Sequence, residues 1–177
     1  MKVGSSDIFN KWNMNIIKVN IVDLYKTGKI VCVTTNGFIK KNGQGVLGRG
    51  NALAMATAIP QLPINLANHI KRNGNVVGPI FKGIISFPVK PAMGNYEQVL
   101  DKVRYMYKPG QQIPGYHCKA DLKLIEQSMN QLNDFINKFN LEEVYLPLPG
   151  TSNGELKFQD VKPILEKGNS KIIYCSL

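Results

Sequence analysis

Long apolar stretches are missing from this chain of 177 residues. No run approaches the roughly 18 apolar residues that a membrane-spanning helix needs. The first residues, MKVGSSDIFNKWN, also lack the apolar stretch of a signal peptide. We therefore expect a soluble, cytoplasmic protein with no membrane partner. A hydrophobic content of 44% is enough for one complete core, so we expect residues 1–177 to form a single domain.

Cysteine and histidine are scarce. Cys32, Cys118 and Cys175 are widely spaced, form no CxxC pair, and have only His69 and His117 as potential co-ligands. A structural zinc site needs a set of closely spaced ligands, so the sequence predicts no metal site and no cofactor. Two of the thiols, those of Cys32 and Cys175, lie in apolar runs, and we interpret them as buried and inert.

Acidic residues are nearly absent from the first half of the chain. Residues 1–90 hold 12 lysines and arginines against only Asp7 and Asp23, whereas residues 91–177 hold ten residues of each sign. The whole net charge of +10 therefore belongs to the first half. Such a basic half favours an anionic partner, either a nucleic acid or a phosphorylated small molecule, unless it is only a solvated face.

Strand-like and helix-like segments alternate along the chain, which is typical of an α/β protein. Strands are expected at 14–22, 29–35, 81–87, 143–146 and 171–176. Helices are expected at 51–59, 63–74, 121–139 and 159–167. Pro88 is expected to close the third strand. Residues 91–119, with four tyrosines and the turn-rich KPGQQIPG, fit neither pattern, and we interpret them as an inserted lid that is helical in part.

A loop with five glycines follows the second expected strand, between Gly37 and Gly50, and leads into an alanine-rich helix. Glycines let backbone N–H groups approach a ligand, and a helix N-terminus favours negative charge, so this geometry suits a phosphate. The loop is not a P-loop, because GxxxxGK[ST] is absent. It is not a dinucleotide-binding fingerprint either, because the spacing differs and no acidic residue follows about 20 positions on.

A second loop of small residues follows the expected strand at 143–146, in the run YLPLPGTSNG that ends at Gly154. Loops at the carboxyl ends of strands in an open sheet face the same crevice, where ligands of α/β proteins usually bind. The two loops together therefore predict a site for a diphosphate.

In six stretches the chain resembles the macrodomain family, most closely its branch related to ADP-ribose-1''-phosphate phosphatases and small macrodomain proteins of bacteria and phages. The stretches are VNIVDL (19–24), IVCVTTNG (30–37), GVLGRGNALAMA (45–56), SFPVK (86–90), DLKLIEQSMNQL (121–132) and LPLPGTSNGELKFQDVKPIL (146–165). The resemblance implies a three-layer α/β/α fold with a central mixed sheet. It also implies a small-molecule ligand, namely ADP-ribose or its 1''-phosphate, cyclic or conjugated form.

The resemblance implies roles for single residues as well. Asp23, beside Leu24, resembles the carboxylate that accepts a hydrogen bond from adenine, although a turn-capping role is the alternative. Asn36, after Thr35, resembles the asparagine that binds the distal ribose, and its alternative is an Asx turn. Phe158 either contacts the ligand or belongs to the core. The two phosphate loops would consist of Gly45, Val46, Leu47 and Gly48, and of Gly150, Thr151, Ser152, Asn153 and Gly154.

Catalysis is where this sequence departs from part of the family. Members that cleave ADP-ribosyl esters use a lysine on the first helix and an aspartate in the second loop. This chain has Gly154 at the position of the acid and no lysine in 51–59. We therefore expect any hydrolysis at the distal ribose to depend on Asn36, with His117 of the insertion as a candidate acid or base. An exposed loop histidine is the alternative for His117.

A nucleic-acid-binding protein is the second hypothesis. It would use the lysines and arginines of the first half on phosphates and the tyrosines of 96–116 as stacking platforms. The lysines are scattered rather than gathered in one stripe, and glycine loops follow a long backbone poorly. We therefore favour the ADP-ribose ligand.

Overall fold

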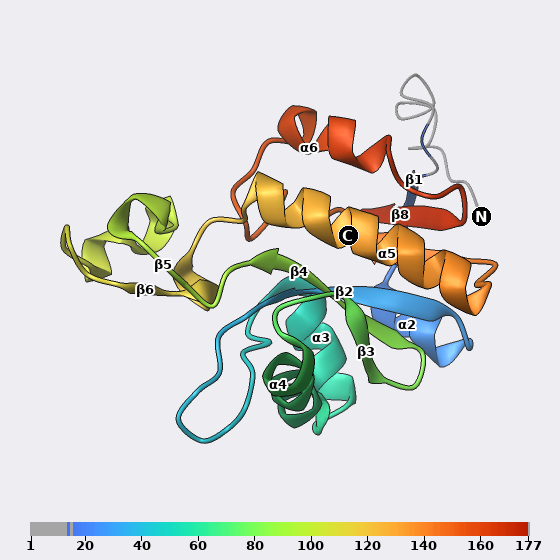
Figure 1. Cartoon of the computed structure of the whole chain (residues 1–177), viewed down its shortest axis with the longest axis horizontal. Coiled ribbons are helices and arrows are strands. Elements are labelled where there is room, and N and C mark those ends of the chain that lie inside the picture. Colours follow the sequence, from blue (N-terminus) through green and yellow to red (C-terminus); the bar gives the residue numbers. More distant parts are fainter. Residues whose placement is uncertain (1–13, 15, 177) are drawn as a thin grey trace.

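The computed structural model describes Met14 and residues 16–176, which surround a six-stranded sheet of order β1-β8-β7-β2-β4-β3 (Figure 1). Neighbouring strands from β1 to β4 in this order run parallel, and β3 is antiparallel to β4. The five parallel strands therefore end at one edge of the sheet. The strands are β1 (Ile16–Lys18), β2 (Ile30–Asn36), β3 (Gly78–Phe81), β4 (Ile84–Lys90), β7 (Val144–Pro147) and β8 (Ile172–Ser176).

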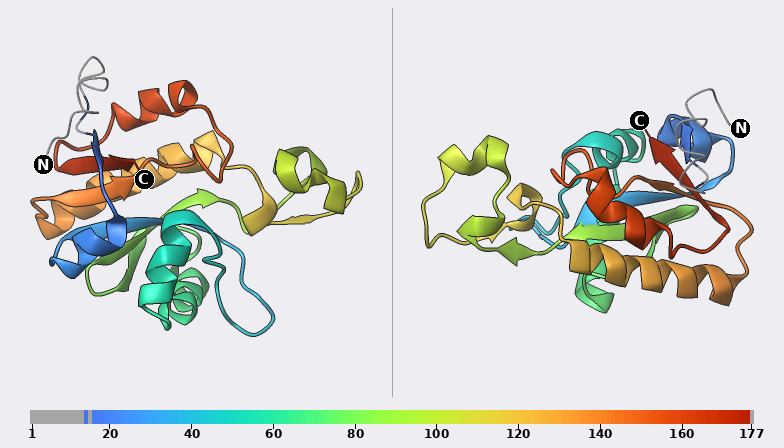
Figure 2. Two further views of the ribbon diagram at one scale, coloured as in Figure 1. Left: turned by 180° about the vertical axis from the view of Figure 1, so that it is seen from behind. Right: turned by 90° about the horizontal axis from the view of Figure 1, so that it is seen from above.

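Helices cover both faces of the sheet (Figures 1 and 2). One face carries α5 (Leu122–Phe139) and α6 (Phe158–Leu165) over a buried cluster that includes Phe87 and Met129. The other carries α2 (Ile21–Lys26), α3 (Gly50–Ala58) and α4 (Leu62–Asn73) over a cluster that includes Val33 and Leu66. The three-layer α/β/α fold with a mixed sheet is therefore confirmed.

Helix α5 follows from its sequence. Ile125, Met129, Leu132 and Ile136 recur at steps of three and four residues and are all buried. The Asp121 side chain accepts a hydrogen bond from the N–H of Leu124 at 3.1 Å and so caps the first turn. This end of the helix packs beside the second glycine loop, which makes α5 a support for the site.

Two of the strand predictions were wrong, each because local capping or turn chemistry outweighed the apolar pattern. The expected strand 14–22 ends at Lys18, because Asn20 accepts hydrogen bonds from the N–H groups of Val22 and Asp23 and starts α2. The expected strand 81–87 is two strands joined by a turn at Gly83, which has a φ of 80°.

Pro88 does not close β4, which runs on to Lys90. The pairing of β3 with β4 ends at Ser86, so Pro88 lies beyond the partner strand and its missing N–H interrupts no ladder on that side. Its carbonyl accepts a hydrogen bond from Ser128 of α5 at 2.7 Å. The two residues that this extension adds, Val89 and Lys90, belong to the candidate site.

The segment between β4 and α5 projects from the side of the sheet (Figure 2) and has a small core around Val99, Leu100 and Ile113. It is helical in part, as expected. Its elements are β5 (Met93–Gly94), η1 (Tyr96–Gln98), η2 (Asp101–Met106), β6 (Ile113–Pro114) and η3 (Gly115–His117), where η marks a 3₁₀ helix.

All three cysteines are buried and free, which confirms the predicted burial of Cys32 and Cys175. Burial raises the pKa of the Cys175 thiol to about 12. Within Met14 and residues 16–176, no helix is long and apolar enough to cross a membrane.

Candidate functional site

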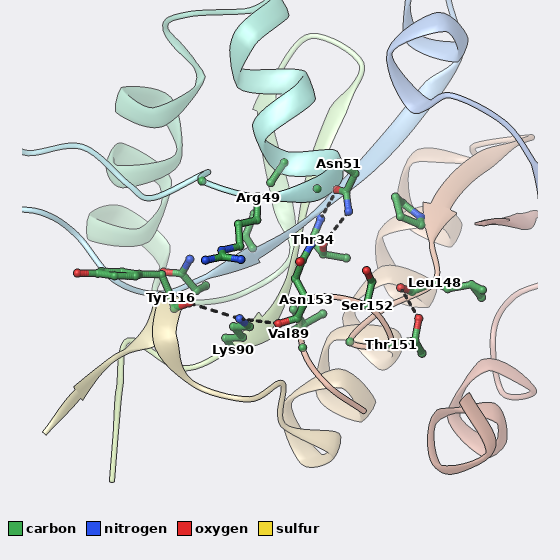
Figure 3. A pocket seen from close by; sticks show the side chains of 18 of the residues that line it. Thr34, Arg49, Asn51, Val89, Lys90, Tyr116, Leu148, Thr151, Ser152 and Asn153 are labelled. Atoms are coloured by element: carbon green, nitrogen blue, oxygen red, sulfur yellow. Dashed lines mark hydrogen bonds between the residues drawn. The ribbon is translucent and has the colours of Figure 1, made fainter. Parts of the chain in front are cut away.

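A cavity of about 420 Å³ opens at the edge of the sheet where the parallel strands end. Its walls come from the carboxyl ends of β2, β4, β7 and β8, from both glycine loops, and from η3 of the insertion (Figure 3). This is the edge at which open α/β sheets usually bind ligands.

The second loop, residues 150–154, is shaped by two glycines. Gly150 has a φ of 75°, and a Cβ there would lie 2.9 Å from Ala120, Ile125 and Leu156 side-chain atoms. A Cβ on Gly154 would lie 2.6 Å from that of Ala120. The loop is therefore packed tightly against the start of α5. No hydrogen bond among the described residues uses the N–H groups of 152–154, so these donors are free for a ligand that enters the cavity.

The first loop is fastened to the end of β2 by Asn36, which is 7% exposed. Its Nδ2 donates to the carbonyl of Val46 at 3.1 Å, and its Oδ1 accepts from the N–H of Phe38 at 2.9 Å. The second bond is the Asx turn considered from the sequence. Among the described residues no hydrogen bond uses the N–H of Gly48 or Arg49, and α3 begins at Gly50 with its own unpaired N–H groups.

The two loops meet across the cavity. A Cβ on Gly50, whose φ is 57°, would lie only 2.7 Å from Nδ2 of Asn153. Asn51 holds the start of α3 against β2, because its Oδ1 accepts from the N–H of Thr34 at 3.1 Å and its Nδ2 donates to Oγ1 of Thr34 at 3.0 Å. The site therefore has two sets of free backbone donors at a fixed separation.

Lys90 brings a buried positive charge to the cavity. Lys90 is 8% exposed, and its ammonium donates to the carbonyl oxygens of Asn153 at 3.3 Å and Tyr116 at 3.5 Å (Figure 3). No ion pair in the described part of the chain involves it. Burial, followed by the charges of Lys102 and Arg49, lowers its pKa to about 8.

Arg49 adds a second cation on the opposite wall, and Figure 3 shows its side chain directed toward Lys90 and Tyr116. Two positive groups that face one cavity repel each other unless an anion lies between them. This end of the cavity therefore favours a negatively charged ligand group.

His117 lines the same end and is held by aromatic neighbours. The hydroxyl of Tyr107 lies 2.6 Å from its Nδ1, and the Tyr116 ring contacts its ring edge-on with centroids 4.6 Å apart. Burial, with the charges of Arg49 and Lys90, lowers the pKa of His117 below its ordinary value. This shift favours the neutral imidazole, which is the form that can accept a proton.

Most of the residues predicted as site residues come together here. The cavity is lined by Thr35, Asn36, Val46, Gly48, His117, Gly150, Thr151, Ser152, Asn153 and Gly154. Five others do not line it. Gly45 and Leu47 are buried within the first loop, and Phe158 is the first residue of α6 and packs against the core. Asp23 and Leu24 lie on α2, with Asp23 exposed.

Arg49, Asn51, Lys90 and Tyr116 line the cavity but were not predicted. Lys90 had a usable signal, because it ends the apolar run IISFPV at the edge where the other parallel strands end. The sequence predicted no lysine in the site because none lies on the first helix. The structure supplies one from β4 instead.

Several solved structures have a similar fold. No model of a protein family and no curated protein matches the sequence. Among solved structures, the macrodomain of Mycobacterium tuberculosis DarG is similar with a TM-score of 0.58 and 19% identity, over 82% of this chain and 86% of that one.

Two further structures are similar over most of this chain. The macrodomain of Thermus aquaticus DarG has a TM-score of 0.57 and 16% identity, over 93% of this chain and 97% of that one. Thermosipho africanus DarTG in complex with ADP-ribose has a TM-score of 0.56 and 13% identity, over 83% of this chain and 37% of that one. Identities this low establish a shared fold and nothing further.

Proposed function

The chain has the macrodomain fold, and from that premise we propose that its cavity binds ADP-ribose or a derivative. One observation carries the proposal: two glycine loops with unpaired N–H groups face each other across a cavity of about 420 Å³. A diphosphate needs such donors on both sides, and one structural neighbour holds ADP-ribose.

We place the distal ribose at the end of the cavity formed by Asn36, Lys90 and His117. The positive charge there suits an anionic substituent, so ADP-ribose-1''-phosphate is the derivative that we favour. Hydrolysis to ADP-ribose and phosphate would use a water oriented by Asn36, with His117 as acid or base. The ammonium of Lys90 would stabilise the charge that develops on the phosphate.

Thermal unfolding tests the binding proposal. ADP-ribose at about a hundred times its dissociation constant should raise the melting temperature by about 5 to 10 °C, because binding to the folded state alone adds about 2.7 kcal/mol. AMP should raise it much less, since it reaches only one of the two loops. A melting temperature that stays constant with millimolar ADP-ribose and with its 1''-phosphate would refute the proposal.

We place the adenine end beyond Ser176, which lines the cavity, and near Asp23, which is exposed in the first turn of α2. We predict that Asp23→Ala weakens the binding of ADP-ribose by about 1.5 to 3 kcal/mol, the range for a hydrogen bond to a charged group, without unfolding the protein. Calorimetry measures the change, with Asp134→Ala on the outer side of α5 as the control. If Asp23→Ala and the parent chain bind ADP-ribose equally well, Asp23 has no role in binding and belongs only to the first turn of α2.

Nucleic-acid binding receives less support from the side chains. Of the four tyrosines in the insertion, Tyr105 is 85% exposed, whereas Tyr96 stacks under Arg104 and Tyr107 and Tyr116 contact His117. One free ring makes a poor stacking platform. A salt series separates the hypotheses, because polynucleotide affinity falls steeply with salt whereas a diphosphate held by backbone N–H groups weakens far less.

A further inference from the structure

The side chain of Glu155 connects the insertion between β4 and α5 to the second glycine loop. This residue follows Gly154 directly, and its φ of 60° lies in the left-handed region that side-chain-bearing residues rarely adopt. The other such residue apart from glycine in the described chain is Asn140, which ends α5, a common role for asparagine. For Glu155, the conformation indicates that surrounding contacts hold it in place.

The Glu155 carboxylate makes those contacts with η2. One oxygen accepts from the N–H of Asp101 at 2.9 Å, and the other lies 3.5 Å from the nitrogen of Lys102. These are the first two N–H groups of η2, which have no acceptor inside the helix. Leu100, at the cap position, offers no side-chain acceptor. Glu155 therefore caps η2 from 54 residues along the chain.

The same region of the insertion is bonded to the cavity wall. The N–H of Leu100, directly before η2, donates to the carbonyl of His117 at 2.9 Å. On the return path, the N–H of Ala120 donates to the carbonyl of Gly154 at 3.0 Å. These hydrogen bonds connect the second loop and η2 to His117, which lines the cavity next to Tyr116.

We propose that Glu155 is a positioning residue of this site, and the inference rests on the proposed function. Its carboxylate fixes the insertion relative to the second loop, so that Tyr116 and His117 already face the loop N–H groups before a ligand arrives. Glu155 does not line the cavity, and both of its oxygens face backbone N–H groups, so it acts through the loop and the insertion. Such preorganisation reduces the ordering cost of binding.

Three variants test the proposal. Glu155→Gly removes the carboxylate but adopts a φ of 60° without steric cost, so the fold is kept. Glu155→Gln retains the side-chain length and one oxygen acceptor. Glu142→Gln, an exposed residue before β7, controls for the loss of one negative charge. For each variant, amide hydrogen exchange is measured at Asp101, Lys102 and 152–154, together with the affinity for ADP-ribose.

In Glu155→Gly we expect exchange at Asp101 and Lys102 to be about tenfold faster and ADP-ribose to bind about tenfold more weakly, at an unchanged melting temperature. Glu155→Gln should recover most of both properties, and the control should match the parent chain. A purely structural role would instead lower the melting temperature and leave the affinity of the folded protein intact.

Unchanged exchange in Glu155→Gly overturns the proposal, and so does faster exchange at unchanged affinity. If the parent chain binds no ADP-ribose, the proposed function fails separately. Exchange at 152–154 then decides for Glu155: faster exchange in Glu155→Gly supports its positioning of the loop, and equal exchange refutes it.

Discussion

Among single residues, Lys90 carries a buried charge that lowers the stability of the folded chain, and an anionic ligand in the proposed site would offset that cost. Its ordinary pKa of 10.5 falls to about 8, chiefly because the ammonium is buried. The unfolded chain therefore binds the proton more tightly than the folded chain does. The free energy of unfolding consequently rises as the pH increases from about 8 to 10.5. An anionic ligand binds more tightly when Lys90 is charged than when it is neutral. The affinity for such a ligand should therefore fall as the pH rises above about 8.

We predict that binding takes up protons near pH 8.5, a pH at which roughly half or more of the free Lys90 is neutral. Calorimetry in two buffers of different ionisation enthalpy measures this uptake. Lys90→Met should abolish this proton uptake and lower the affinity for the ligand. It should also raise the free energy of unfolding at pH 7 by about 1 to 3 kcal/mol. Lys123→Met, at an exposed position of α5, is the control. Identical proton uptake in Lys90→Met would assign the titration to another group.

Asn36 joins the end of β2 to the first loop, so its replacement should affect the distal end of the ligand most. We predict that Asn36→Ala abolishes phosphate release from ADP-ribose-1''-phosphate while the adenosine end still binds. His117→Ala should reduce the rate only mildly if the insertion serves mainly as a lid. Phosphate release and AMP affinity are the two measurements. Full activity of Asn36→Ala would rule out the proposed mechanism.

Residues of the site differ in how far the sequence predicted them. Asn36 and Gly150 could be predicted because they depend on short-range geometry, namely an Asx turn and a positive φ. Lys90 was missed despite its place at the end of an apolar run, because Pro88 was expected to end β4 two residues earlier. Whether proline ends a strand depends on the neighbouring strand's length, and β3 stops pairing at Ser86.

Among the elements, the second loop depends on close packing against α5. We predict that Gly154→Ala lowers the free energy of unfolding by about 1 to 3 kcal/mol, because the new Cβ would lie 2.6 Å from Ala120 and 2.7 Å from the Gly150 carbonyl oxygen. Gly48→Ala is the matched control in the first loop, where the nearest atom to a new Cβ is 3.7 Å away. Urea denaturation measures both. Equal stabilities would mean that the loop can relax without cost.

The elements themselves could be predicted where one apolar period persists. The helix at 121–139 and the strand at 171–176 match α5 and β8 within a residue. The start of α2 could not be separated from β1, because IIKVNIV continues the strand pattern past Asn20. The side chain of Asn20 decides the matter by capping the N–H groups of Val22 and Asp23.

For the whole molecule, alternating segments and two glycine loops predicted the layers and the position of the cavity. The order of the strands in the sheet could not be predicted from the sequence. β1 pairs with β8, so that Ile16 lies opposite Tyr174, and β2 lies between β4 and β7. Such pairings join segments far apart in sequence and leave no local pattern. The course of the insertion likewise depends on distant contacts, notably that of Glu155 with Asp101.

The central claim is that one diphosphate lies between the two loops, and backbone amide NMR during an ADP-ribose titration tests it most directly. The account predicts that the amide resonances of Gly48, Ser152, Asn153 and Gly154 shift together and saturate with one dissociation constant. Gly83, in the turn between β3 and β4 at the opposite end of the strand from Lys90, should stay unchanged. Amides of both loops that do not move at millimolar ADP-ribose would contradict the account.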